Sequence, residues 1–136
     1  MARGAARRTV EKPKWRDFER VGRSFAEAAA LAAEFEYWNA AGVLIVHAAV
    51  ALTDAVTVRL AGVKSAGEDH GQAASLLQEV VVGDEESGRA IRQLRSLIQE
   101  KTRVSYSGEV YGPRDVARLQ KHFGRFRQWV NELLLP

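Results

Sequence analysis

One face of the helix predicted around residues 85–106 combines positive charge with aromatic surface. Its side chains recur at spacings of three and four residues: Arg92, Arg95, Gln99, Arg103 and Tyr106. A row of guanidinium groups that ends in a phenol can hold phosphate oxygens and stack a base. For Arg92 and Arg95 we favour the alternative that they form a solvated face opposite the apolar stripe of the same helix.

The end of this helix is the stronger candidate site. Arg103 and Tyr106 lie where the helix meets a loop that contains Gly108 and Gly112, and a pocket can open at such a junction. Arginine would supply a bidentate contact to phosphate, and tyrosine would supply a stacking surface. With Lys101 as a third contact, we expect these residues to bind a nucleotide or RNA.

A second polar stripe follows the otherwise apolar helix predicted over residues 39–64. Five residues share one narrow face of it: Asn39, His47, Asp54, Thr57 and Lys64. An unpaired charge buried on such a helix would be costly, so the stripe should face either a cleft or a polar seam between subunits. Both alternatives stay open. In the binding hypothesis, His47 and Asp54 line the same cleft as Arg103.

Other reactive side chains predict no catalytic or metal site. The chain has no cysteine, and its histidines, His47, His70 and His122, have no partner at the spacing of metal ligands. We find no motif for nucleophilic catalysis, no phosphate-cradling loop and no paired carboxylates. We therefore expect no catalytic residues, no metal and no cofactor. Asp69 or His70 is most simply a helix cap.

Apolar residues that recur every three or four positions predict five helices and no strand. The helices cover about residues 15–38, 39–64, 72–82 and 85–106, and the last begins at Pro113. Short connections between helices of these lengths favour antiparallel neighbours. The sequence therefore predicts an all-α, up-down bundle of four to five antiparallel helices.

The first and last helices carry continuous apolar seams. The seam of the first, which we expect to face other helices, consists of Phe18, Val21, Phe25, Ala28, Ala32 and Phe35. The basic residues of the last helix share one face that we interpret as solvated: Arg114, Arg118, Lys121 and Arg125. The helix over residues 39–64 is apolar nearly all round and would leave apolar surface exposed in a monomer. This predicts a homodimer.

Charge is distributed unevenly along the 136 residues. Net charge is +5 over residues 1–16, −6 over residues 17–100 and +4 over residues 101–136. We expect residues 1–14 to form a flexible basic tail and residues 15–136 to form one domain. The basic last third favours a phosphate-bearing or acidic partner. No secretory signal is found and the longest uncharged run is short for a membrane span, so we expect a cytoplasmic protein without membrane association.

The order of these elements resembles the HEPN family of helical domains. The resemblance rests on the Ala-rich segment His47–Arg59, on His70 followed by Leu76 and Leu77, on the helix end Arg103–Tyr106 and on the finish Phe126–Trp129. It implies a bundle of four or five helices, often dimeric, with a nucleotide- or RNA-binding cleft near the end of the penultimate long helix. Many members work beside a small nucleotidyltransferase, and many are toxin ribonucleases. The resemblance thus implies a toxin–antitoxin or nucleotidyltransferase-associated module.

The ribonuclease members are similar in carrying an arginine followed by four to six residues and then a histidine. Carried onto this chain, the arginine is Arg103, and the histidine would fall at Gly108, Glu109 or Val110. Without an imidazole there, no evident group exchanges protons with a ribose hydroxyl near neutral pH. We therefore expect a non-catalytic dimer that binds a nucleotide, RNA or a partner protein.

Two alternatives to this binding function stay open. One is a ribonuclease with an altered catalytic set that uses His47 or His70. The other is a purely structural interaction module in which the apolar helix over residues 39–64 forms the dimer interface. A small nucleotidyltransferase encoded by the neighbouring gene would favour the paired module.

Overall fold

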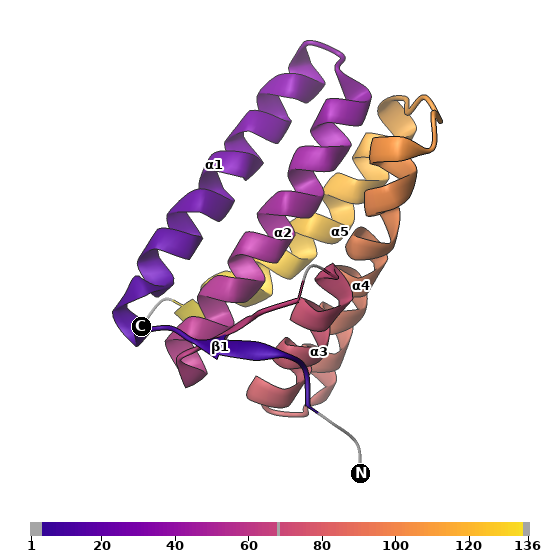
Figure 1. The fold of residues 1–136 in the computed structure, drawn as a ribbon. Helices are drawn as coiled ribbons and strands as arrows, with labels where there is room; N and C mark the ends of the chain where they lie inside the picture. The colour runs from indigo at the N-terminus through magenta and orange to yellow at the C-terminus, as the bar shows by residue number, and fades with distance from the viewer. Residues whose placement is uncertain (1–3, 68, 135–136) are drawn as a thin grey trace.

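The computed structural model describes residues 4–67 and 69–134, and five helices account for most of them. The helices are α1 (Trp15–Glu34), α2 (Trp38–Ala61), α3 (His70–Val80), α4 (Glu85–Tyr106) and α5 (Pro113–Leu134). A short 3₁₀ helix, η1 (Lys12–Lys14), and two strands, β1 (Arg7–Thr9) and β2 (Val63–Ser65), complete the described elements. The prediction of an all-α helical bundle is confirmed (Figure 1).

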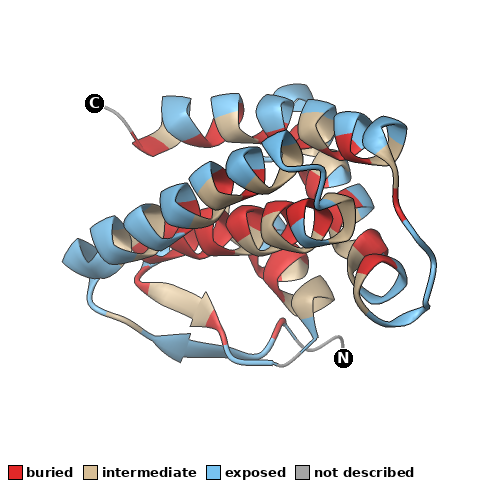
Figure 2. Cartoon of the chain, turned by 90° about the horizontal axis from the view of Figure 1, so that it is seen from above, coloured by how far each residue is buried: buried red, intermediate tan, exposed pale blue. Residues whose placement is uncertain are grey.

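Helix α2 is the centre of the bundle. It packs against α1, α3, α4 and α5, and Figure 1 shows it between α1 at one edge and α4 and α5 on the other side. Its residues from Ala51 to Val58 are all buried, whereas the outer faces of the surrounding helices are exposed (Figure 2). By length and apolar composition α2 could cross a membrane, but 78% of its most apolar window is buried inside the bundle. That burial is typical of a core helix.

Local backbone signals set the ends of the helices. Glu36 has a positive φ of 63° and Gly62 one of 65°, and each of these left-handed residues ends the helix before it. The carboxylates of Asp69 and Asp84 accept hydrogen bonds from backbone N–H groups in the first turns of α3 and α4. Each therefore caps the helix that follows, and the expectation that Asp69 is a cap is confirmed.

Helix α5 closes the core beside α2 and α4. Its predicted apolar seam consists of Val116, Leu119, Phe123, Phe126, Val130 and Leu133, and all of these are buried except Leu133, which is half-buried. Leu94 and Leu97 of α4 and Ile45 and Leu52 of α2 belong to the same core. Burial of each such side chain contributes about 1.5–3 kcal/mol to stability. This packing fixes the facing surfaces of α4 and α5 relative to each other.

Residues 4–14 do not form the expected flexible tail. Strand β1 pairs antiparallel with β2. Nη2 of Arg7 lies 2.8 Å from Oε1 of Glu79 in α3, and the backbone N–H of Ala5 donates to the same carboxylate. Periodicity does not reveal this pairing, because a three-residue strand is too short to show alternation. Residues 1–3 of the expected tail lie outside the described residues.

Helix α1 lies at the edge of the bundle and packs mainly on α2 (Figure 1). The expectation that its whole apolar seam faces other helices is wrong, because Val21 is 46% exposed and Phe35 is 68% exposed. Leu31, on the same flank of the helix, is 56% exposed. Among the described residues, α1 packs chiefly on α2, so this flank is left exposed.

Candidate functional site

Arg103 projects from the last turn of α4 and pairs with two carboxylates. Its Nη2 lies 2.5 Å from Oε2 of Glu109, and its Nη1 lies 3.4 Å from Oε2 of Glu100. The guanidinium also lies over the ring of Tyr111, 5.4 Å from the centroid. The bond to Glu109 holds the pKa of Arg103 above its ordinary value. The donors that we expect to contact a ligand therefore already bind the protein's own carboxylates.

Glu100 connects α4 to α5 and to the loop between them. Its carboxylate accepts a hydrogen bond of 2.9 Å from the hydroxyl of Tyr111 and lies 2.5 Å from Nη1 of Arg118. Burial raises the pKa of Glu100, but the bonds from Arg118 and Tyr111 outweigh it, so the pKa lies below its ordinary value. Burial, together with the bond to Glu100, raises the pKa of Tyr111 to about 12. The charges around Arg103 are thus largely balanced within the chain.

Asn39, at the start of α2, forms hydrogen bonds to the end of α4 and to the loop between α4 and α5. Its side-chain amide donates to the carbonyl oxygens of Val104 and Glu109, at 3.0 and 2.9 Å. Its own side-chain oxygen accepts a hydrogen bond of 2.8 Å from the backbone N–H of Tyr111. The first residue of the polar stripe on α2 therefore holds the α4–α5 loop in place and does not face a ligand.

Tyr106 and Lys101 lie on different sides of the same helix end. Tyr106, one turn beyond Arg103, is 79% exposed and shares a face with that arginine, as the sequence predicts. Lys101 is two residues before Arg103, and this spacing points its side chain to the other side of α4. Tyr106 therefore offers an open aromatic surface, whereas Lys101 belongs to another group of residues.

The charge of Lys101 in α4 acts on both His47 in α2 and His70 in α3. His47 comes from the middle of α2, His70 from the first turn of α3 and Lys101 from the last part of α4. The two imidazole rings meet edge to face with their centroids 6.0 Å apart. The ring of Phe25 in α1 lies 5.6 Å from that of His47, and all four side chains are half-buried. We call His47, His70 and Lys101 the histidine cluster.

Both imidazoles of the histidine cluster resist protonation. Partial burial is the larger cause and the positive charge of Lys101 adds to it, so the pKa values of His47 and His70 lie below the ordinary 6.5. Near neutral pH each ring is therefore neutral, with one N–H donor and one acceptor nitrogen. Such a pair beside an ammonium group can bind a phosphate or exchange a proton with a bound hydroxyl.

Asp54 lies two turns from His47 on α2 but faces a different partner. Asp54 is 5% exposed, and its Oδ2 lies 3.5 Å from Nζ of Lys64 in β2. Burial raises the pKa of Asp54 to about 6, although Lys64 lowers it. Asp54 therefore forms a buried ion pair beneath β2.

The residues expected in one cleft thus fall into three groups. His47 and Lys101 lie together, Arg103 shares its side of α4 with Tyr106, and Asp54 lies with β2. The polar residues of α2 share one side of the helix, but successive residues along it contact different elements of the fold. The structure therefore brings the five expected contacts together only as two pairs, and it leaves Asp54 apart from both.

Three further residues of these groups are not evident from local sequence patterns. The sequence indicates His70 as a possible helix cap or as an alternative catalytic residue, but no local pattern predicts that its ring meets that of His47. Glu100 and Tyr111 show no distinctive spacing, because the residues that they contact come from other elements. Over residues 4–67 and 69–134, no three histidine, aspartate or glutamate side chains gather as metal ligands.

Comparison with known proteins assigns neither a family nor a function to this chain. No family model, no curated protein and no solved structure matches the chain. The functional inference therefore rests on the residues and on their arrangement.

Proposed function

We propose that the protein is a nucleotide- or RNA-binding domain whose contact site is the histidine cluster. One observation carries this proposal: His47, His70 and Lys101 come from three different helices and converge at one place. Partly buried ionisable groups with shifted pKa values are typical of functional sites. Lys101 supplies a positive charge, and the neutral imidazoles supply N–H donors to phosphate oxygens.

The surroundings of the histidine cluster suit the remainder of a nucleotide. Val43 and Val50 are half-buried and lie one turn before and one turn after His47 on the same side of α2. The ring of Phe25 beside His47 offers aromatic surface on which a base can stack. A nucleotide whose phosphate contacts Lys101 would therefore meet both charge and apolar surface.

We propose further that the protein is a homodimer that pairs through the uncovered side of α1 and α2. We call this surface the open α1–α2 face. It consists of exposed or half-buried apolar residues of both helices: Val21, Ala28, Leu31, Phe35 and Leu44. Contiguous apolar surface is typical of interaction sites. Because the histidine cluster borders the open α1–α2 face, a second copy on it would bring two clusters close together.

Membership of the HEPN family is part of this proposal and rests on the sequence pattern together with the order of the helices. In this interpretation the protein works beside a small nucleotidyltransferase or as one half of a toxin–antitoxin pair. Co-expression with the product of the adjacent gene, followed by size-exclusion chromatography, tests the partnership. A nucleotidyltransferase that co-elutes with the protein would support it, and separate elution of the two chains would contradict it.

The binding proposal is tested with a short, fluorescein-labelled single-stranded RNA in an anisotropy titration. We expect Lys101→Ala, and His47→Ala combined with His70→Ala, to weaken binding by about tenfold or more, because hydrogen bonds to charged groups contribute about 1.5–3 kcal/mol each. Arg20→Ala is the matched control for Lys101→Ala, since it removes one exposed positive charge from α1. Equal affinity of the Lys101 variant and this control, with both folded by circular dichroism, would contradict the proposal.

A ribonuclease is the second candidate, favoured by the two imidazoles 6.0 Å apart. One neutral imidazole would take the proton of a ribose 2′-hydroxyl, whose oxygen attacks phosphorus, while the second, protonated imidazole gives a proton to the leaving 5′-oxygen. Because the pKa values of His47 and His70 are lowered, the protonated partner is populated only at acidic pH, and cleavage should increase there. Metal-independent cleavage that is lost in His47→Ala and His70→Ala but kept in His122→Ala would establish the activity. Intact RNA across the same pH range would leave binding alone.

A further inference from the structure

The surface between α4 and α5 holds a groove that the proposed function does not use. Its larger hollow has a volume of about 410 Å³ and is lined by residues of both helices. Pockets that hold small ligands span roughly 300–1,000 Å³. The hollow therefore has room for one nucleotide-sized ligand.

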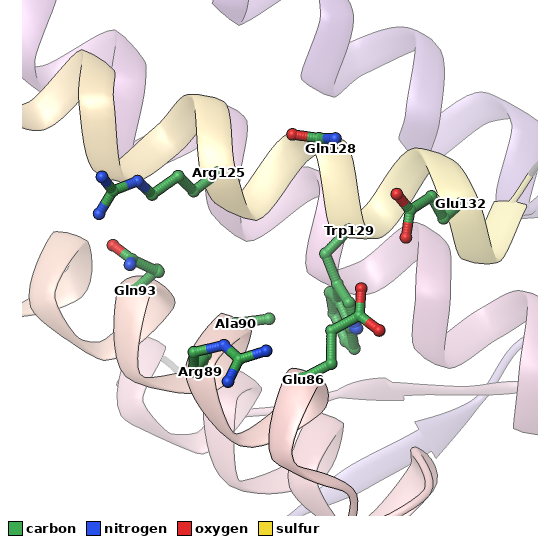
Figure 3. A pocket seen from close by; sticks show the side chains of 8 residues that line it. All are labelled: Glu86, Arg89, Ala90, Gln93, Arg125, Gln128, Trp129 and Glu132. Carbon is green, nitrogen blue, oxygen red and sulfur yellow. The ribbon is translucent and has the colours of Figure 1, made fainter.

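The larger hollow has a basic end and an acidic end. Figure 3 shows Arg125 of α5 and Gln93 of α4 facing each other at one end. Glu86, Trp129 and Glu132 gather at the other end. A ligand that lies along the groove would therefore meet donors for an anion at one end and carboxylate acceptors beside an aromatic ring at the other.

A second hollow of about 250 Å³ continues the groove from its basic end. It shares Arg89 and Gln93 with the first and adds Arg92 and His122. The ring Nδ1 of His122 is hydrogen-bonded to Oε1 of Gln93, which ties α5 to α4 at the junction. The two hollows therefore form one elongated groove with most of its positive charge near the middle.

The arginines of the groove differ from Arg103, which binds the chain's own carboxylates. Among the residues that the structure describes, Arg92 and Arg125 form no ion pair. Arg89 pairs with Glu85, at 3.2 Å, and both of these side chains are exposed. An exposed pair of this kind contributes little and exchanges readily with another anion. Arg125 in the larger hollow and Arg92 in the smaller one thus have donors for a phosphate chain, and Arg89, which lines both hollows, adds a third guanidinium group.

We propose that the groove between α4 and α5 binds a nucleoside polyphosphate. The phosphates lie where the two hollows join, among the three arginines. The base lies at the acidic end against the edge of Trp129, where an amino group of the base donates to Glu86 or Glu132. This site shares no residue with the histidine cluster and does not depend on it.

Isothermal titration calorimetry with ATP, UTP and inorganic triphosphate tests the groove. ATP should bind more tightly than UTP and more tightly than inorganic triphosphate, because only adenine brings an amino group to the carboxylates. Arg92→Ala with Arg125→Ala should weaken ATP binding by about tenfold or more. The matched control, Arg20→Ala with Arg114→Ala, removes two exposed positive charges outside the groove and should keep the affinity.

The remaining measurements test the nucleoside assignment and separate the groove from the histidine cluster. Equal ATP affinity in the groove variant and its control would overturn the proposal, and equal binding of ATP and inorganic triphosphate would overturn the nucleoside assignment. Glu86→Gln with Glu132→Gln should narrow the difference between ATP and UTP. Lys101→Ala should weaken RNA binding more than ATP binding, whereas the groove variant should weaken ATP binding more than RNA binding. Loss of ATP binding in Lys101→Ala, with binding kept in the groove variant, would move the nucleotide to the histidine cluster and overturn the proposal.

Discussion

Asp54 and Glu100 are both buried carboxylates, but their neighbours affect them in opposite ways. Glu100 pairs with Arg118 and accepts a hydrogen bond from Tyr111. Asp54 has one lysine at 3.5 Å, and its Oδ1 has no hydrogen-bond partner among the described residues. The pKa of Glu100 therefore lies below its ordinary value and that of Asp54 above it. Near neutral pH the charge of Glu100 stabilises the fold, whereas the charge of Asp54 destabilises it.

Asp54→Asn is expected to stabilise the protein above pH 6. The pKa of Asp54 is about 6 in the folded protein against an ordinary 3.8. The folded state thus binds more protons between these values, and the stability due to Asp54 is lost as pH rises through this window. The difference between the two pKa values corresponds to about 3 kcal/mol at most. Because Lys64 loses its charged partner in the variant, we expect the free energy of unfolding to rise by about 1–2 kcal/mol near pH 7.

Urea unfolding followed by circular dichroism measures this gain. Near the ordinary pKa of 3.8 the variant and the wild type should be equally stable, because protonated aspartate and asparagine are both neutral. His47 and His70 are present in both proteins, so their own pH dependence cancels in the comparison. Asp17→Asn changes an exposed carboxylate and serves as the control. A variant less stable than wild type near pH 7 would show that the pair with Lys64 outweighs burial.

Glu100→Gln is expected to destabilise the protein near neutral pH by about 1–3 kcal/mol, because the amide keeps the shape but loses the charge that pairs with Arg118. Since the pKa of Glu100 is lowered in the folded protein, the stabilisation that its charge gives the wild type is present above the ordinary pKa of 4.5. It is lost as the pH falls through the pKa of the folded state. The decrease in melting temperature that Glu100→Gln causes should therefore be smaller at acidic pH.

Arg103→Ala should also lower the melting temperature and leave RNA affinity unchanged. An unchanged melting temperature with lost RNA binding would return Arg103 to the binding site.

At the scale of elements, periodicity predicts where helices lie but not what covers them. Helix α4 has the expected bounds, Glu85–Tyr106, because capping carboxylates and an apolar stripe mark it locally. The seam of α1 has the same spacing as that of α5, yet Phe35 is exposed and Phe126 is buried. This difference arises because α5 packs between α2 and α4, whereas α1 has one neighbouring helix.

The candidate site could be predicted from the sequence as single residues but not as groups. His47 is evident because it interrupts an apolar helix, and Arg103 is evident because it marks a helix end. The contact of His47 with His70 and the pairing of Arg103 with Glu109 depend on how separate elements meet. Helix–helix contacts of this kind have no fixed sequence spacing, so periodicity cannot reveal them.

The close approach of α1 to α2 depends on Gly22. A Cβ at this position would lie 2.8 Å from Cδ2 of Leu52 and 3.3 Å from the backbone oxygen of Ala48. Gly22→Ala is therefore expected to destabilise the protein by about 1–3 kcal/mol. Gly124→Ala in α5 is the matched control, since nothing lies within 4 Å of its Cβ position, and it should stabilise by about 1 kcal/mol. Chemical unfolding measures both, and a stabilising Gly22→Ala would contradict the tight contact.

At the scale of the whole molecule, the open α1–α2 face has a size that suits a small protein–protein interface. Helix α1 has 20 residues, which gives a length of about 30 Å. Two helices of roughly 10 Å diameter side by side are about 20 Å wide, so the open α1–α2 face measures about 600 Å². Two copies would bury about 1,200 Å², the lower limit for a stable complex. Such a dimer should dissociate on dilution.

Sedimentation velocity at increasing protein concentration tests this dimer, and the monomer should convert to a dimer. Leu31→Glu with Phe35→Glu is expected to keep the protein monomeric, because burying two unpaired charges costs several kcal/mol. Val82→Glu with Val110→Glu is the matched control, since these residues are 77% and 87% exposed outside the open α1–α2 face. If two histidine clusters contact one RNA across the interface, the monomeric variant should also bind RNA more weakly than this control. A wild type that stays monomeric at the highest concentration would contradict the dimer, and equal RNA affinity of both variants would then locate binding within a single chain.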